Sequence, residues 1–428
     1  MAEKMKPSGI DWIGDIPAEW NMNRFQNLLS QVKEKNRGLK EKNLLSLSYG
    51  KIIKKDIFTA SGLVPENYDT YNIVKKNDII LRLTDLQNDQ VSLRTGIVEE
   101  EKGIITSAYV ALRANNCNAS YYHWLLYAFD TTKEIYSYGQ GVRQGLTYEE
   151  LKKMLIPLFS EEEQQLIADF LDDRCAQIDS IAADLEKQIE ILQKYKKSLI
   201  TETVTKGLDK VVPMKDSGID WIGEIPEHWD IKRVKDCGKM QTGTTPPSNE
   251  GINYECNGFS WYTPSDFVDG SIALKEAEKC IENEIVARES IRIYPKESIL
   301  FVGIASIGKI GFCEKESYSN QQITAIKPKA NEEGKYISYV LLAGMDSIKD
   351  NALYTTVPII NNAYLGTVKI CIPSKDEQIK ICDFLDIKCK HIDELVEEKQ
   401  KQLETIQQHK KSLIYEYVTG KKRVKEAL

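Results

Sequence analysis

The sequence predicts an α+β chain in which two α/β domains are separated by two long antiparallel helices that form a coiled coil, with a pseudo-two-fold internal repeat. One observation is that Glu163–Thr205 and Glu377–Thr419 share the order Glu-Gln, Asp-Phe-Leu-Asp, Cys, Ile-Asp, Lys-Ser-Leu-Ile and Val-Thr in the same register. The other is that the regions before each copy alternate short β-rich runs with turn residues, which is typical of compact mixed domains.

The repeated segments have the pattern of paired helices. Neither contains Gly or Pro, and their apolar residues recur every three or four positions, which places one narrow stripe on each helix. An isolated helix with such a stripe is marginal in water, so we expect the copies to pair with each other. Separate bundles, or pairing between molecules, are the alternatives. The predicted helix-pairing residues are Leu171, Ile178, Ile181, Leu185, Leu192 and Leu199 in the first copy and Leu385, Ile392, Leu395, Ile406 and Leu413 in the second.

A second repeated element precedes each variable region. Met5–Trp20 and Met214–Trp229 are nearly identical, and their density of Gly and Pro excludes a long helix. We therefore predict two ordered arms whose tryptophans are buried against the neighbouring helices. Stacking of these tryptophans on nucleic-acid bases is the alternative, although identical residues in both halves would give both halves the same specificity.

Between arm and helix the two halves diverge. Strands are predicted at Asp78–Leu83, Gly96–Val98 and Gly103–Leu112 in the first half and at Ser298–Val302, Lys309–Cys313 and Gln322–Ile326 in the second. The resulting division has six segments: an arm at 1–23, a variable domain at 24–157, a helix at 158–208, a second arm at 209–232, a second variable domain at 233–373 and a second helix at 374–428.

Composition limits the class of protein. The net charge of −7 is unlike that of a simple duplex-binding domain. The charge is uneven, because residues 24–157 hold 19 Lys and Arg against 15 Asp and Glu, whereas residues 233–373 hold 15 against 17. Nucleic acid, if bound, is therefore expected on the variable domains. The lack of a long apolar run, and of any CxxC among nine cysteines, predicts a cytoplasmic protein without a membrane span, a zinc site or a secreted disulfide framework.

Several motifs together resemble the specificity subunit of a Type I restriction-modification system, over essentially the whole chain. They are SGIDWIGDIPAEW and SGIDWIGEIPEHW in the arms, the paired helices, QTGTTPP at Gln241–Pro247 and GQGVRQGLTYEELKKMLIP at Gly139–Pro157. The resemblance implies two target-recognition domains that each bind one half of a bipartite, asymmetric double-stranded DNA site. It also implies that helices and arms dock two modification (methyltransferase) subunits, and that restriction/translocase subunits join through that core. No cofactor is expected on this chain; S-adenosylmethionine, ATP and Mg²⁺ are expected on the partner subunits.

The lack of recognisable catalytic motifs in the sequence favours a chain without its own active site. Gly303–Lys309 resembles a phosphate-binding loop, but Ile310 stands where Ser or Thr should bind magnesium, and β-like runs flank it. We predict a Gly-rich hairpin there instead. No Asn-Pro-Pro-Tyr methyltransferase motif, helicase box or nuclease cluster is present in the sequence. The alternatives are a protein scaffold of duplicated coiled coils, and a nucleotide hydrolase that uses Gly303–Lys309.

Residues that contact DNA bases should be polar side chains on loops, because these form bidentate hydrogen bonds with base edges. The candidates in the first domain are Arg82, Thr84, Asp85, Gln87, Asn88, Gln90, Arg94, Tyr138, Gln140, Arg143 and Gln144. Those in the second are Thr242, Thr244, Thr245, Ser306, Lys309, Asn320, Gln321 and Gln322. Phosphate contacts are predicted for Lys33, Lys35, Lys54, Lys55 and Lys275. The alternative for each is a solvated loop residue or a local turn hydrogen bond.

Overall fold

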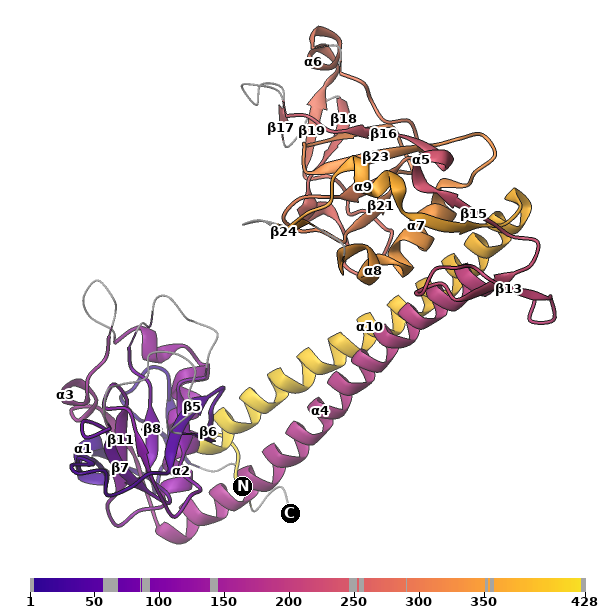
Figure 1. The fold of residues 1–428 in the computed structure, drawn as a ribbon. Coiled ribbons are helices and arrows are strands. Elements are labelled where there is room, and N and C mark those ends of the chain that lie inside the picture. Colours follow the sequence, from indigo (N-terminus) through magenta and orange to yellow (C-terminus); the bar gives the residue numbers. More distant parts are fainter. Residues whose placement is uncertain are drawn as a thin grey trace. The chain divides into compact units, whose positions relative to one another are not determined.

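The computed structural model is a mixed α+β chain whose contacts group it into two compact units (Figure 1). The first unit comprises Met1–Glu186 with Lys401–Leu428, and the second comprises Lys187–Gln400. The structure describes residues 4–56, 68–84, 86, 93–138, 145–245, 252–253, 258–289, 291–350, 353–354 and 358–424. Within these ranges, no helix combines the length and the apolar character that a membrane crossing requires.

Two long helices contribute to both units. Helix α4 spans Glu161–Lys206 and α10 spans Lys375–Val418, close to the predicted bounds. Both begin with acidic residues, which favour the positive end of the helix dipole. In the first unit the start of α4 runs antiparallel to the end of α10, since Phe170 packs on Tyr417 and Asp179 pairs with Lys410 at 2.6 Å. In the second unit Lys196 of α4 pairs with Asp393 of α10 at 2.8 Å.

The predicted helix-pairing residues are mostly buried or partly buried. Among them Leu171, Leu185 and Leu385 are buried, and Leu192, Leu199, Leu395, Ile406 and Leu413 are partly buried. Ile181 is 49% exposed, so its assignment to the stripe is wrong. The reason is spacing: after Ile178 the stripe advances by four residues and then three, so the small side chain of Ala182 takes the inner position.

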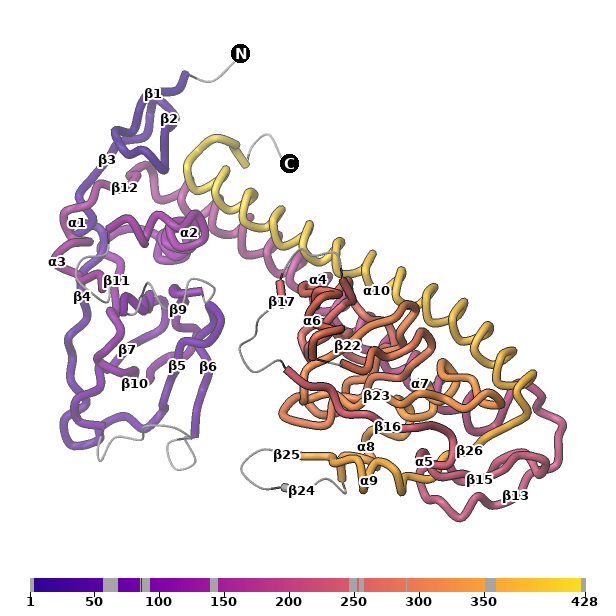
Figure 2. Tube along the Cα trace, turned by 90° about the horizontal axis from the view of Figure 1, so that it is seen from above, coloured from indigo at the N-terminus to yellow at the C-terminus, as the bar shows by residue number. Residues whose placement is uncertain are grey.

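The repeated arms form two-stranded antiparallel ribbons, β1 (Met5–Pro7) with β2 (Asp15–Pro17) and β13 (Met214–Asp216) with β14 (Glu224–Pro226) (Figure 2). Gly14 and Gly223 adopt φ of +67° and +68°, a conformation that disfavours other residues. Trp20 and Trp229 are fully buried, and their indole N–H groups donate to Glu163 and Glu377 at 3.3 and 3.0 Å. The prediction that the arm tryptophans anchor on the long helices is therefore confirmed for Trp20 and Trp229. Trp12 instead packs on Phe129, and Trp221 is only partly buried.

The first unit contains two four-stranded sheets, in the orders β6-β5-β10-β7 and β4-β11-β8-β9. Their strands are β5 Leu44–Ser48, β6 Lys51–Lys55, β7 Asn72–Lys75, β10 Lys102–Ile105, β4 Leu29–Gln31, β8 Ile79–Leu81, β9 Thr95–Ile97 and β11 Val110–Ala114. The single strand predicted at Gly103–Leu112 is wrong. A turn, with Tyr109 N–H donating to Thr106 O, divides that run into β10 and β11, which belong to different sheets.

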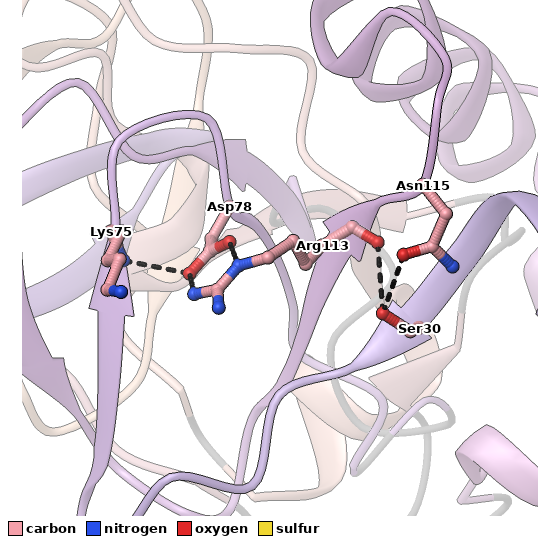
Figure 3. Close-up of polar contacts among 5 residues, drawn as sticks. All are labelled: Ser30, Lys75, Asp78, Arg113 and Asn115. Atoms are coloured by element: carbon pink, nitrogen blue, oxygen red, sulfur yellow. Dashed lines mark hydrogen bonds and ion pairs between the residues drawn. The ribbon is translucent and has the colours of Figure 1, made fainter.

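A buried ion pair stabilises the junction of these sheets. Asp78 is 1% exposed and lies directly before β8. Its carboxylate accepts two hydrogen bonds from Arg113 of β11, at 2.8 and 2.6 Å, and a third from Lys75 N–H at 2.8 Å (Figure 3). Such bidentate pairing raises the pKa of Arg113 and satisfies a charge that would be costly to bury alone.

Helices and a terminal ribbon complete the first unit. Strand β3 (Asn21–Arg24) pairs with β12 (Leu155–Leu158), and α2 (Ala119–Thr131) is buried along most of its length. Tyr121 of α2 donates to Val418 O at the end of α10 at 2.8 Å, and Trp124 donates to Asp172 of α4 at 2.7 Å. Helix α2 is thus bonded to both long helices. The remaining short helices are α1 Phe25–Leu28, η1 Glu134–Tyr136 and α3 Tyr148–Leu151.

His123 of α2 makes the stability of the first unit depend on pH. Burial, and secondarily the charge of Lys410, lower its pKa to about 4 from 6.5. The unfolded chain therefore binds a proton first, so stability is full above pH 6.5 and falls as the pH drops towards 4, by about 3 kcal/mol in all. We expect His123→Phe to flatten this profile in urea unfolding measured between pH 4 and 7. The exposed His409→Phe is the control, and an unchanged slope in His123→Phe would contradict this account.

The second unit has its own pair of four-stranded sheets, β16-β23-β20-β21 and β17-β19-β18-β22. The strands of the first are β16 Gly238–Thr242, β20 Ile299–Val302, β21 Ile310–Phe312 and β23 Ile323–Pro328. Those of the second are β17 Ile252–Asn253, β18 Gly258–Tyr262, β19 Lys279–Glu282 and β22 Ser317–Ser319. Three predicted strands are confirmed here as β20, β21 and β23.

The second unit is bonded to the long helices through α7 (Gly334–Ala343). Tyr336 of α7 donates to Val204 O at the end of α4 at 3.1 Å, and Tyr339 donates to Asp386 of α10 at 2.8 Å. The other elements are α5 Val234–Cys237, η2 Pro264–Asp266, α6 Asn283–Arg288, α8 Met345–Asp350, α9 Asn362–Thr367 and the pairs β15 Asp230–Arg233 with β26 Lys369–Ile372 and β24 Leu353–Tyr354 with β25 Pro358–Ile359.

Candidate nucleic-acid interface

In the first unit the structure brings together the two segments that carry the predicted base-contacting residues. Arg82 and Thr84 follow β8, and Leu146 N–H donates to Leu83 O at 2.9 Å, which joins this segment to the one that begins after Tyr138. Seven of the predicted base-contacting residues lie outside the described residues: Asp85, Gln87, Asn88, Gln90, Gln140, Arg143 and Gln144. The described ends of the two segments, at Leu83 and Leu146, are thus hydrogen-bonded to each other.

Arg94 supports the first of these segments from inside, so its predicted base contact is wrong. Its side chain is fully buried, donates to the carbonyl oxygens of Arg82 and Thr84 at 3.3 and 2.8 Å, and reaches Tyr136 Oη at 3.2 Å. Guanidinium has five donors in a planar fork, which suits it to gather several backbone acceptors. Its place directly before β9, whose first two residues are buried, was the available signal.

The other predicted residues of the first unit are surface groups. Tyr138 is 36% exposed, its ring lies 5.7 Å from that of Phe129, and partial burial raises its pKa. Lys35 donates to Thr70 O at 2.8 Å and Lys54 pairs with Glu100 at 2.8 Å, whereas Lys33 and Lys55 are exposed. Phosphate contact by these lysines stays a prediction.

In the second unit, residues from two predicted segments form three separate groups of side-chain hydrogen bonds around the paired ends of β16 and β23, and these groups are here together called the amide network. It consists of Thr242, Thr245, Asn320, Gln321, Gln322, Thr324 and Asn362. Thr245 Oγ1 donates to Gln321 Oε1 at 2.7 Å, and Asn320 Nδ2 donates to Gln322 Oε1 at 2.9 Å. Side chains nearly eighty positions apart in sequence therefore share one polar surface.

A glycine allows the backbones under this network to meet. Gly243 N–H donates to Ile323 O at 3.0 Å and Thr244 N–H donates to Ser319 O at 3.1 Å. A Cβ at Gly243 would lie 2.3 Å from the carbonyl oxygens of both Ser319 and Asn320. No other residue fits this approach without moving the backbone, which explains the glycine between the threonines of the QTGTT segment.

Sequence analysis missed two members of the amide network. Asn362 Nδ2 donates to Thr242 Oγ1 at 2.8 Å, and Thr324 Oγ1 donates to Asn362 Oδ1 at 2.6 Å. Asn361 caps α9 by accepting from Tyr364 N–H at 2.8 Å. An Asn-Asn pair before a short apolar stretch is a helix-start signal, and it could have drawn attention to this position.

Ser306 and Lys309 belong to a neighbouring hairpin. Strands β20 and β21 pair antiparallel and Val302 N–H donates to Lys309 O at 3.0 Å, so the hairpin predicted at Gly303–Lys309 is confirmed. Ser306 is exposed in the connecting turn, and the ammonium of Lys309 lies 3.2 Å from Asp269. Lys275, a predicted phosphate contact, donates to Ser265 O at 3.3 Å. The Lys309 charge is therefore already paired with a carboxylate.

The chemistry of the amide network suits recognition. Carboxamides and hydroxyls present both donors and acceptors, as base edges do. Across the residues that the structure describes, no three His, Cys, Asp or Glu side chains come together as metal ligands.

Comparisons with known proteins agree with a role in DNA recognition. A family model for the Type I restriction modification DNA specificity domain matches residues 17–191 and 226–405. The putative type I restriction enzyme MjaX specificity subunit of Methanocaldococcus jannaschii is 27% identical over 433 residues, which is 96% of either chain. The type I restriction enzyme MjaIX specificity subunit of the same organism is 33% identical over 189 residues, or 44% of this chain and 43% of that protein.

A solved structure shares the fold. It is described as the structural basis underlying complex assembly and conformational transition of the type I R-M system. Its TM-score is 0.68 at 16% identity, over 94% of this chain and 98% of that one.

Proposed function

Because this chain belongs to the Type I restriction modification DNA specificity family, we propose that each of its units recognises one half of a bipartite, asymmetric DNA target while the long helices dock two modification subunits. Specificity subunits of type I systems are DNA-recognition subunits without a catalytic site of their own, and this chain is one of them. What we propose beyond this is the division of DNA recognition between the two units and the attachment of the modification subunits to the long helices.

The observation that carries the proposal is a repeated frame that holds two different recognition surfaces. Trp20 with Glu163 and Trp229 with Glu377 are matching contacts in the two units. The polar surfaces differ, since the first unit has a buried arginine that donates to the carbonyl oxygens of Arg82 and Thr84, and the second has the amide network. Unlike surfaces on like frames suit a target whose halves have different sequences. In this proposal residues 24–157 and 233–373 are the recognition domains.

Partner docking is supported by the charges that join the long helices. Asp179 pairs with Lys410 and Asp393 pairs with Lys196. The two aspartates are 214 positions apart in the sequence, and so are the two lysines. Lys196 and Lys410 have side-chain exposures of only 10% and 15%. Equivalent frames suit two copies of one modification subunit, related by pseudo-two-fold symmetry. Restriction subunits would then join through the assembled core.

Mapping of methylated bases tests the proposal directly. DNA from cells that carry this chain with its modification subunit should show methylation within one split motif, whose halves differ in sequence and are separated by unspecified bases. Cells without this chain should lack that methylation. A short uninterrupted motif would contradict division of the target between two units, and methylation independent of this chain would favour a scaffold that does not recognise DNA.

A further inference from the structure

Gln321 is an exposed member of the amide network. It lies in the turn from β22 to β23, which is closed by Ile323 N–H donating to Asn320 O at 3.2 Å. Asn320 and Gln322 on either side hold each other: Asn320 Nδ2 donates to Gln322 Oε1, and Gln322 N–H donates to Asn320 Oδ1 at 3.0 Å. Asn320 is 9% exposed whereas Gln321 is exposed. Of three consecutive carboxamides, the middle one is therefore presented to a ligand.

The hydroxyl of Thr245 fixes the orientation of that carboxamide. It donates to Gln321 Oε1 at 2.7 Å, which places Oε1 on the side of Thr245 and Nε2 on the other side. Oε1 keeps a second lone pair and Nε2 keeps its two protons. The outward edge of Gln321 therefore offers one acceptor and one donor in a fixed order.

The backbone below this pair is held from several strands, so the pair is preorganised. Asn320 N–H donates to Tyr262 O of β18 at 3.2 Å, and Gly303 N–H, next to β20, donates to Gln322 O at 2.9 Å. The backbone at Gly243, just after β16, lies close to the carbonyl oxygens of Ser319 and Asn320, so the end of β16 is packed against the turn that carries Gln321. A side chain fixed before binding loses less conformational freedom in the complex, which improves both affinity and discrimination.

We propose that Gln321 and Thr245 are a specificity-determining pair, in which Thr245 holds the Gln321 carboxamide to recognise adenine in the half-site bound by the second unit. This inference rests on the proposed function. In the major groove adenine presents the N7 acceptor beside the N6 donor, which complements Nε2–H and Oε1. Guanine presents two acceptors, N7 and O6, and its O6 would face Oε1 without a proton between them.

The test uses the full chain assembled with its modification subunit and DNA in which each base of the target is varied in turn. For the parent chain we expect an adenine requirement at one position of the half-site bound by the second unit. Gln321→Ala should reduce that preference roughly ten-fold or more. Gln321→Arg should shift it to guanine, because arginine donates to both O6 and N7. Thr245→Val should relax discrimination of adenine against guanine while binding is retained.

Matched measurements separate this inference from a purely structural role. Gln241→Ala removes a β16 side chain that donates to Arg292 O, and it should leave the preference unchanged. Thermal unfolding and assembly of each variant should match the parent chain. Equal loss at both half-sites, or an unchanged motif in every variant, overturns the pair as a specificity determinant. If the motif is unchanged but exchange of residues 233–373 for those of another specificity subunit alters one half-site, the pair fails while the proposed function stands.

Discussion

Replacement of residues 24–157 by the corresponding region of another specificity subunit should change one half of the methylated motif and leave the other half unaltered. The physical reason is that the replaced region forms its own two sheets, whereas the amide network is built from residues 242–362. No residue of that network is touched by the exchange. We expect the new half-site to match that of the donor protein.

The measurement is base-resolved mapping of methylation in cells that carry the hybrid chain and its modification subunit. The junctions should lie at β3 and β12, because these strands pair with each other from Asn21 to Leu158 and close the region. The Trp20–Glu163 bond and the Asp78–Arg113 pair must each keep their partners, so the donor should supply both members of the latter.

A reciprocal hybrid is the matched control. Exchange of residues 233–373, closed by the β15–β26 pair, should alter the opposite half only. A hybrid that assembles but alters both half-sites, or neither, would contradict the division of the target between the units.

The frame of this chain was predictable from sequence because its signals are local and repeated. Uninterrupted helical periodicity over Glu163–Thr205 and Glu377–Thr419 predicted α4 and α10 to within two residues at either end, although α10 ends at Val418 and so does not fill the segment predicted at 374–428. The clustered Gly and Pro predicted ordered, non-helical arms, which the structure forms as ribbons. The error at Ile181 arose within a correct helix. Ile181 and Ala182 are adjacent, and only one of them can lie on the inner face of the helix. The prediction selected Ile181 because it is the larger apolar side chain, but that side chain points to solvent.

The proposed recognition surfaces were harder to predict because their contacts are not local. Arg94 is of a residue type that often contacts DNA, yet its guanidinium donates hydrogen bonds to carbonyl groups ten and twelve positions earlier in the chain. Asn362 joins a network whose other members precede it by up to 120 positions. The division of Gly103–Leu112 into strands of different sheets likewise depends on pairing partners that no short window contains. Residue type identified the second-unit candidates, and tertiary contact decided which of them act together.

Leu185→Asp should strongly destabilise the pairing of the long helices. Leu185 is 8% exposed and lies one heptad after Ile178 on the inner stripe of α4. A carboxylate there would lose hydration without gaining a partner, at a cost of about 3 kcal/mol or more. We expect a lowered midpoint in thermal unfolding and loss of assembly with the modification subunit on size-exclusion chromatography.

Ile181→Asp is the matched control, because it makes the same chemical change one turn away on the same helix. Ile181 is 49% exposed, so its carboxylate would stay hydrated and both unfolding and assembly should stay close to those of the parent chain. If the two variants behaved alike, burial on the inner stripe would not be what holds the helices together. If Leu185→Asp unfolded earlier but still assembled normally, the helices would be paired as proposed while the modification subunits attached elsewhere. Comparison of the two variants therefore separates helix pairing from partner docking.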